Sequence, residues 1–337
     1  MGADIVRLRE DEGLGWQAIA ERLGLKNRDA AQRAYTAAKK GEAPESIIRP
    51  VTQRPRLGHV LDLDARPFAV PIPRPAKVQL KGKYQHAVWW SDSHMGFQDQ
   101  TALDVVLGII KDVRPAKLFH GGDIVDAYSI SAFDKNPSRL HTLQDEIDMG
   151  RSHLHQVSQL APTAEKTLLE GNHEDRLRRV IWSLPGTASE LARLRAFKQA
   201  MTWPSLLGLD EIGWGFVPAH QQPLLGALPK LALKHGDLVR KESAMTARAE
   251  YGRYTMSGIS GHTHRLGKFY HRDLRDSHAW IESGCTCRIK NVEYVPHPNW
   301  QQGCVVITYK TDGSWFHAQD IYIEAGQAMW GAREYAA

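Results

Sequence analysis

Cysteine is scarce in this chain of 337 residues, which holds only Cys285, Cys287 and Cys304. Three clustered thiols are too few for the disulfide framework of a small secreted protein, so we expect a reducing compartment. The Cys285-x-Cys287 spacing is one residue shorter than that of a zinc knuckle. We therefore expect buried structural thiols.

Long apolar runs are missing as well. No stretch approaches the roughly 18 apolar residues of a membrane-spanning helix, and the first residues lack the apolar core of a signal peptide. The expectation is a cytoplasmic protein with no membrane partner.

Charge is nearly balanced, since 43 Lys and Arg residues against 38 Asp and Glu residues give a net charge of +5. An excess this small indicates a polyanionic partner only if the positive charges cluster. They do so at residues 174–198 and 264–275. The 42% hydrophobic content is typical of a globular protein that buries a core.

Residues 1–41 are predicted to form a small helical domain of three helices separated by glycine-containing turns. A short helix, a turn and a second helix outline a helix-turn-helix, and residues 16–25 resemble the core of that family. On the third helix Arg28, Arg33 and Lys39 would meet DNA phosphates. The alternative is a helical docking domain with a solvated basic face.

Residues 42–76 carry many prolines and are expected to form an extended linker. Residues 77–325 alternate between strand and helix patterns, which predicts an α/β (α+β) domain with a β-layered core and outer helices. Residues 326–337 are set apart as a C-terminal tail. The expected strands are 84–91, 117–120, 167–170, 231–234, 258–260, 279–282 and 304–310, and the expected helices are 101–113, 143–160 and 243–253, with a helical insertion at 174–209.

Five polar groups each follow an apolar run, and ligands of α/β sheets gather at the carboxyl ends of strands. Carboxylates and imidazoles on such loops suit Mn²⁺, Fe or Zn²⁺. Two such ions can neutralise a phosphate ester and activate a water, so the pattern predicts a pair of divalent metals. The groups are Asp92-Ser93-His94, Gly122-Asp123-Ile124-Val125-Asp126, Gly171-Asn172-His173-Glu174, His235-Gly236-Asp237 and Gly261-His262-Thr263-His264.

In this order the five groups resemble the motifs of the calcineurin-like metallophosphoesterase superfamily, over roughly residues 84–309. The arrangement is similar to phage and bacterial members, and its core to the nuclease subunit of double-strand-break-repair exonucleases. The resemblance implies a two-sheet β-sandwich flanked by helices, in a bacterial or phage-infected cell. It also implies two divalent metal ions, with Mn²⁺ preferred over Fe, Zn, Ni and Mg.

The resemblance further implies a role for each matching residue. The first metal would be held by Asp92, His94 and His264, and Asp123 would bridge to the second. The second would be held by Asn172, His235 and His262. A metal-bridging hydroxide would then attack phosphorus while His173 acts as general acid, with Asp126 orienting the site.

Several residues keep two interpretations. Asp126 either orients the site or caps the helix that follows it. Arg176 either clamps a substrate phosphate or is a solvated helix charge. Structural roles are expected for His120, His220 and Asp237.

The motifs predict phosphoester hydrolysis and leave the substrate open. The helix-turn-helix-like domain and the basic stretches favour a DNA phosphodiesterase, an endonuclease or nickase. The alternative is a phosphomonoesterase, acting on proteins or small molecules, whose N-terminal domain serves assembly. A third interpretation is a non-enzymatic DNA-binding or virion module with a vestigial site. The oligomeric state is left open.

Overall fold

The computed structural model describes residues 2–40, 83–139, 141–274, 276–290 and 297–337. The chain divides into two compact units, Met1–Gln79 and Leu80–Ala337. The predicted linker at 42–76 lies outside the described residues. None of the described helices combines the length and apolar character of a membrane span.

The first unit contains three helices, α1 (Gly2–Glu10), α2 (Trp16–Arg22) and α3 (Arg28–Lys39). Their apolar faces meet in a small core that includes Ile5, Ile19 and Ala31. Helix α3 starts at Arg28 because Asn27 caps it: the Asn27 side chain accepts a hydrogen bond from the Ala30 amide at 2.9 Å.

The second unit is built on two sheets. The first has the strand order β11-β10-β1-β2-β3-β4, in which β1 to β4 run parallel. The second has the order β5-β6-β7-β9-β8, with β6, β7 and β9 parallel. The strand bounds are β1 (Tyr84–Trp90), β2 (Lys117–His120), β3 (Glu165–Leu169), β4 (Gly215–Val217), β5 (Leu224–Leu228), β6 (Leu231–Lys234), β7 (Ser257–Ser260), β8 (Leu266–Arg272), β9 (Ser277–Ser283), β10 (Gln302–Lys310) and β11 (Phe316–Ile323).

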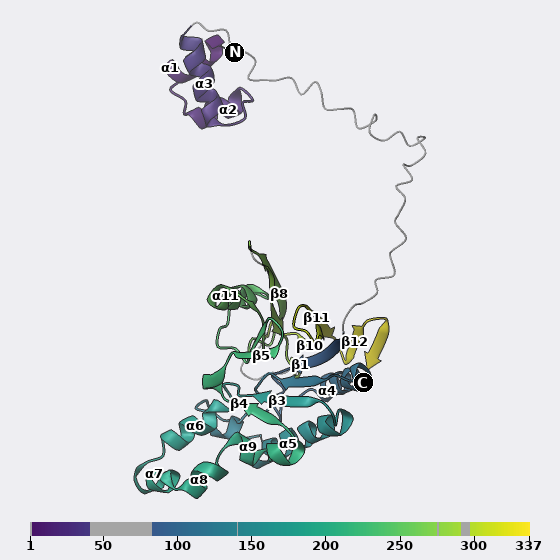
Figure 1. Ribbon diagram of the computed structural model, residues 1–337. Coiled ribbons are helices and arrows are strands. Elements are labelled where there is room, and N and C mark those ends of the chain that lie inside the picture. The colour runs from purple at the N-terminus through teal and green to yellow at the C-terminus, as the bar shows by residue number, and fades with distance from the viewer. Residues whose placement is uncertain (1, 41–82, 140, 275, 291–296) are drawn as a thin grey trace, which may run out of the picture. The chain divides into compact units, whose positions relative to one another are not determined.

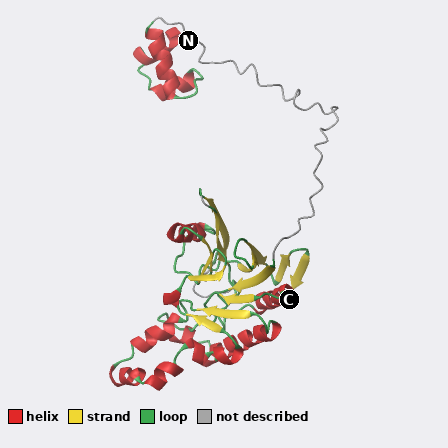
Figure 2. Cartoon of the chain, in the orientation of Figure 1, coloured by secondary structure: helices red, strands yellow, loops and turns green. Residues whose placement is uncertain are grey.

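Helices cover the outer face of each sheet (Figures 1 and 2). In Figure 1, α5 and α9 lie below β3 and β4, whereas α11 lies beside β8. Helix α5 begins with a capping box between Thr142 and Asp145, which fixes its start. The helices of this unit are α4 (Gln100–Val113), α5 (Leu143–Leu160), α6 (Asp175–Trp182), α7 (Gly186–Arg193), α8 (Arg195–Ala200), α9 (Trp203–Leu206), α10 (Leu209–Ile212) and α11 (Met245–Tyr254).

Strand β1 shows how the layers arise from the sequence. Val88 and Trp90 point into the core beneath α4 and α5, while Ala87 and Trp89 point into the core between the two sheets. Because successive side chains of a strand face opposite sides, the half of β1 that is covered on both faces, residues 87–90, is apolar throughout. The two-sheet sandwich flanked by helices, as expected from the sequence, is therefore confirmed.

The last residues extend this fold. Within 326–337, which the sequence set apart as a tail, β12 (Gln327–Trp330) and β13 (Arg333–Ala336) form an antiparallel hairpin. Tyr335 of the hairpin is buried in the core that contains the apolar face of α4. This hairpin therefore packs as part of the second unit.

Candidate metal centre

The five motif loops begin where parallel strands end. Asp92 follows β1, Asp123 follows β2 and Asn172 follows β3 of the first sheet. His235 follows β6 and His262 follows β7 of the second sheet. The carboxyl ends of parallel neighbours lie at one edge of a sheet, so the loops of both sheets meet at one place.

Asp123 belongs to two sets of potential ligands. It lies with Asp92 and His94 in one set, and with His235 and His262 in another; within each set the ligand atoms lie within 4.8 Å of one another. Its Oδ2 is 3.7 Å from His94 Nε2 and 3.3 Å from His235 Nε2. This carboxylate thus stands between the two ligand sets, the place that the resemblance assigns to a bridging ligand.

The remaining predicted ligands join the same two sets. His264 Nε2 lies 3.3 Å from Asp92 Oδ1 and 3.1 Å from His94 Nε2. Asn172 Oδ1 lies 3.0 Å from His235 Nε2. The structure therefore brings all seven residues predicted as ligands together, in the grouping that the resemblance implies.

The orientation of the histidine rings tests whether a metal fits. The outer nitrogen of each of three rings already has a partner: His94 Nδ1 lies 3.0 Å from Asp126, His235 Nδ1 lies 2.9 Å from the Gly121 carbonyl, and His264 Nδ1 lies 3.9 Å from Cys287 Sγ. Their Nε2 atoms therefore face the centre with the oxygens of Asp92 and Asp123. Rings held in this way are typical of metal-binding histidines, so the donor set fits divalent cations.

Burial and neighbouring charges separate the pKa values of the site. Burial raises the pKa of Asp92, but its hydrogen bond with His264 and the charge of His264 lower it to about 2. Burial lowers the pKa of His235, whereas the charge and hydrogen bond of Asp123 raise it to about 10. Asp92 is thus ionised at neutral pH, and metal binding must displace a proton from the His235 ring.

The backbone of the site is strained. Among non-glycine residues with positive φ are five predicted ligands, a conformation that only a few per cent of such residues adopt. These residues are Asp92 (55°), His94 (46°), Asp123 (52°), His262 (69°) and His264 (57°). The surrounding contacts hold the ligands in these conformations, which indicates that stability is given up at this site for ligand geometry.

Two glycines permit the loops to approach one another. A Cβ atom at Gly171 would lie 2.1 Å from Asp123 Oδ1, and one at Gly261 would lie 2.4 Å from Asp92 Oδ2. Any side chain there would push away a predicted metal ligand. The glycines of the two motifs are thus required by the packing of the site.

His173 stands at the edge of the ligand cluster. Its Nδ1 lies 2.8 Å from the Asp126 carbonyl and 3.2 Å from Asp126 Oδ1, and its Nε2 lies 3.9 Å from Asp123 Oδ2. Burial lowers its pKa, but the charge of Asp123 and the hydrogen bond with Asp126 raise it to about 9. Asp126 contacts both His94 and His173, and the short 3₁₀ helix after it has no side-chain cap, which favours the orienting role over the capping role.

Arg176 also lies at the site. Its guanidinium donates to the Asp126 carbonyl at 2.7 Å and approaches His173 Nε2 to 3.1 Å. It is therefore not a freely solvated helix charge.

Glu174 has no role implied by the resemblance, yet it supports the site. Its buried carboxylate accepts hydrogen bonds from the amides of Asp123 (2.9 Å), Ile124 (2.8 Å), Val125 (3.2 Å) and Gly171 (2.8 Å). It thereby ties the Asp123 loop to the Asn172 loop. The motif signalled this position, since an acid ends the Gly-Asn-His-Glu group.

Other supporting residues were missed altogether. The buried Glu146 of α5 accepts from the amides of Ala127 and Tyr128, and the buried Glu282 of β9 accepts from the Thr263 hydroxyl, between two predicted ligands. Nothing in the local sequence indicates these contacts, because each carboxylate comes from an element distant from the motifs.

Two of the three residues expected to be structural make ordinary contacts. His120 is buried, with Nε2 2.9 Å from Ser93 Oγ, and Asp237 forms ion pairs with Lys234 and Arg253. The predicted DNA-binding residues Arg28, Arg33 and Lys39 belong to the first unit and are exposed on α3, where Lys39 pairs with Glu10 at 2.7 Å.

Comparison with known proteins gives distant similarities. No protein-family model matches the chain. Gene 54 protein of Mycobacterium phage D29 is 26% identical over 245 residues, covering 70% of this chain and 93% of the phage protein. A predicted phosphoesterase from Streptococcus pneumoniae TIGR4 has a similar structure, with 12% identity, 76% and 99% coverage and a TM-score of 0.31.

The nuclease MPE of Pseudomonas putida is also similar, with 12% identity, 65% coverage of this chain, 82% of that chain and a TM-score of 0.31. At TM-scores this low, a function has to be inferred from the side chains of the chain itself.

Proposed function

We propose that this chain, which has the two-sheet fold of a calcineurin-like metallophosphoesterase, hydrolyses phosphodiester bonds of DNA with two divalent metal ions. One observation carries the metal-dependent part of the proposal: Asp123 Oδ2 stands between His94 Nε2 and His235 Nε2, each of which belongs to its own ligand set. A carboxylate shared by two imidazole-containing sets is the donor pattern of a dinuclear centre.

The two ions would be held by the seven side chains described above, with Mn²⁺ the preferred metal because the donors combine carboxylate and amide oxygens with imidazoles. When bound, a metal pair neutralises the charge of the phosphoryl oxygens and activates a water for attack on phosphorus. The chain itself orients the donors, through Asp126, Gly121 and Glu174.

His173 would protonate the departing oxygen. Asp126 holds its Nδ1, so that Nε2 is the nitrogen that faces Asp123. The contact from Arg176 needs an unprotonated Nε2, whereas the raised pKa of His173 favours a protonated ring. The two states can follow one another if the guanidinium moves to a phosphoryl oxygen when substrate binds. His173 Nε2 can then carry a proton and give it to the leaving group.

Charge supports DNA as the substrate. Residues 175–198 carry more basic than acidic side chains and lie in helices α6, α7 and α8, of which α6 directly follows the Asn172 loop. In the first unit, α3 presents the exposed Arg28, Arg33 and Lys39 after a turn, as a recognition helix would. Both features suit a polyanion, and neither is needed by a phosphatase for small monoesters.

Nicking of a supercoiled plasmid tests the proposal. We expect Mn²⁺-dependent nicking that is lost in His94→Ala and His173→Ala. A variant with Arg28, Arg33 and Lys39 all changed to Ala should bind DNA more weakly and hydrolyse a small chromogenic diester normally. Rapid turnover of a phosphomonoester with no cleavage of supercoiled, linear, single-stranded or branched DNA would contradict the proposal and favour the phosphomonoesterase alternative.

A further inference from the structure

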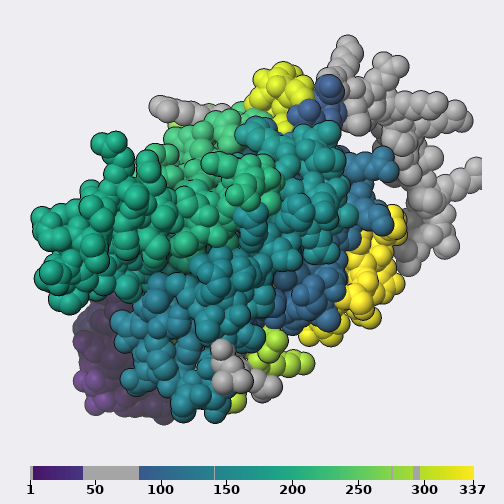
Figure 3. Space-filling model, turned by 90° about the horizontal axis from the view of Figure 1, so that it is seen from below, coloured from purple at the N-terminus to yellow at the C-terminus, as the bar shows by residue number. Residues whose placement is uncertain are grey.

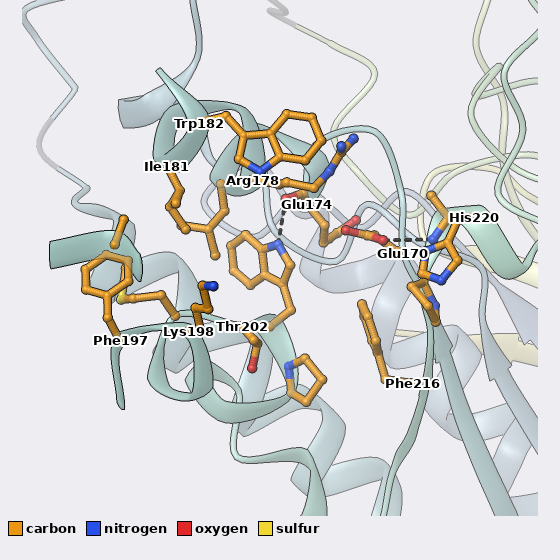
Figure 4. Close-up of a pocket in the computed structure, with 17 residues that line it drawn as sticks. Glu170, Glu174, Arg178, Ile181, Trp182, Phe197, Lys198, Thr202, Phe216 and His220 are labelled. Atoms are coloured by element: carbon orange, nitrogen blue, oxygen red, sulfur yellow. Dashed lines mark hydrogen bonds between the residues drawn. The ribbon is translucent and has the colours of Figure 1, made fainter. Parts of the chain in front are cut away.

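A cavity of about 520 Å³ lies beside the metal centre, under the helical insertion (Figure 4). Its walls come from α6, α8 and α9 and from the segments around β4, and they are mainly apolar. In Figure 4, Phe197 and His220 lie at opposite ends of the cavity. Figure 3 shows the insertion as a lobe at one edge of the second unit. A volume of this size is in the range of small-ligand pockets.

The cavity adjoins the metal centre. A groove of about 320 Å³ contains the predicted ligands Asn172 and His235, and three residues line both spaces: Glu170, Arg178 and Ala219. Glu174 connects the two spaces as well. Its carboxylate holds the Asp123 amide, and its carbonyl accepts a hydrogen bond from Trp203 Nε1 at 2.6 Å in the cavity wall.

An exposed tryptophan stands at the mouth of the cavity. The side chain of Trp182 is 72% exposed, and the guanidinium of Arg178 lies 4.3 Å from the centre of its ring. Arg178 is held in turn by Asp175, one turn away on α6. An indole that is exposed yet held in place by a cation can serve as a stacking surface, because a ring that covers it would remove apolar surface from water.

Two cations line the cavity, and the two carboxylates that also line it, those of Glu170 and Glu174, already accept backbone amides. Arg178 stands where the cavity joins the groove, and the exposed Lys198 lies at the cavity's edge. A flat apolar ring attached to a phosphate would match the exposed indole and the cations. Its ring would lie on Trp182 and its phosphate would point toward the metal ligands. An aliphatic chain or an apolar peptide would use the ring alone and would offer no anion to Arg178 or Lys198.

We propose that this cavity binds the nucleobase adjacent to the scissile phosphate. It would thereby select nucleotide diesters over phosphodiesters that carry no base. The inference rests on the proposed function, because it places the phosphate of the same substrate on the metal centre. Stacking on an aromatic side chain tolerates every base, which suits hydrolysis of DNA without strict sequence preference.

Three chromogenic diesters with the same charge and the same leaving group test this inference: methyl p-nitrophenyl phosphate and the 5′ and 3′ p-nitrophenyl phosphates of thymidine. With Mn²⁺, the full chain should show a higher kcat/KM for at least one thymidine ester than for the methyl ester. Trp182→Ala should lower that ratio about 5- to 150-fold, the range of base–aromatic stacking. Trp182→Phe should keep most of the ratio.

Trp315→Ala is a matched control, because Trp315 is also a partly exposed tryptophan but lines a different cavity. It should leave the ratio as in the wild type. The inference would be overturned by a thymidine-to-methyl ratio of kcat/KM near one in the wild type, or by a ratio that neither Trp182→Ala nor Phe197→Ala changes. Hydrolysis of the methyl ester would in that case still support the metal-dependent phosphodiesterase. Absence of Mn²⁺-dependent hydrolysis of all three esters would instead overturn the proposed function, and the inference with it.

Discussion

Glu174 offers a sharp test of how the metal loops are held together. Each of its two carboxylate oxygens accepts two backbone amides, Oε1 from Ile124 and Val125 and Oε2 from Asp123 and Gly171. In Glu174→Gln an NH₂ group replaces one oxygen, so two buried amides lose their acceptor. At about 1–3 kcal/mol for each unsatisfied group, the substitution should cost roughly 2–6 kcal/mol of unfolding free energy.

Thermal unfolding followed by circular dichroism measures this cost. A loss of this size in a domain of this length corresponds to a fall in Tm of roughly 5–20 °C. Since the two tied loops carry Asp123 and Asn172, affinity for Mn²⁺ should fall about 10- to 100-fold, as it does when other supporting contacts of metal ligands are removed.

Glu170→Gln is the matched control. Glu170 directly follows β3, four residues before Glu174; it is half-buried, and its carboxylate accepts a single amide, that of Ala219, at 2.8 Å. Its replacement should cost less than about 1.5 kcal/mol. If Glu174→Gln unfolded at the wild-type temperature and bound Mn²⁺ normally, the carboxylate would not be the tie between the loops.

Further outcomes follow from the same geometry. His173→Asn should lower kcat for a diester about 10²- to 10⁴-fold, as expected for loss of a general acid, while calorimetry shows Mn²⁺ binding close to that of the wild type; loss of the metal would instead make His173 a ligand. Removing the metal with a chelator should abolish hydrolysis, and adding Mn²⁺ should restore it; activity that survives the chelator would contradict a metal-dependent site. Because Asp123 raises the pKa of His235 to about 10 in the metal-free protein, the ring is protonated below that pH and must release its proton on binding. Affinity for Mn²⁺ should therefore increase from pH 6 to pH 9, by up to about tenfold per unit, with proton release detected by calorimetry in two buffers; an affinity independent of pH would contradict this assignment.

Short buried strands and amphipathic helices were predictable because their signal is local. The bounds of β2, β6 and α5 agree with those expected from apolar runs and helical periodicity. Strands such as β4, β8 and β11 were not foreseen. Strand β4 has only three residues at a sheet edge, and β8 is largely polar and partly exposed, so pairing partners rather than apolar pattern decide their structure.

The site shows the same division between local and distant information. The order and type of the motif residues suggested which side chains would meet, and the structure places them within reach of one another. The contacts of Glu146, Glu282 and Cys287 come from other elements and leave no mark in the motifs. The cavity by Trp182 likewise depends on how the short helices of the insertion fold back, which no single segment encodes.

The central claim, a dinuclear centre that hydrolyses phosphodiesters, is tested most directly by titrating metal-free protein with Mn²⁺ while following hydrolysis of a thymidine p-nitrophenyl diester. We predict that activity appears with the second equivalent of Mn²⁺ and reaches its limit at two ions per chain, and that Asp123→Asn, which weakens the shared ligand, stays inactive over the same range. Full activity with one equivalent, or no hydrolysis at any Mn²⁺ concentration, would contradict the claim.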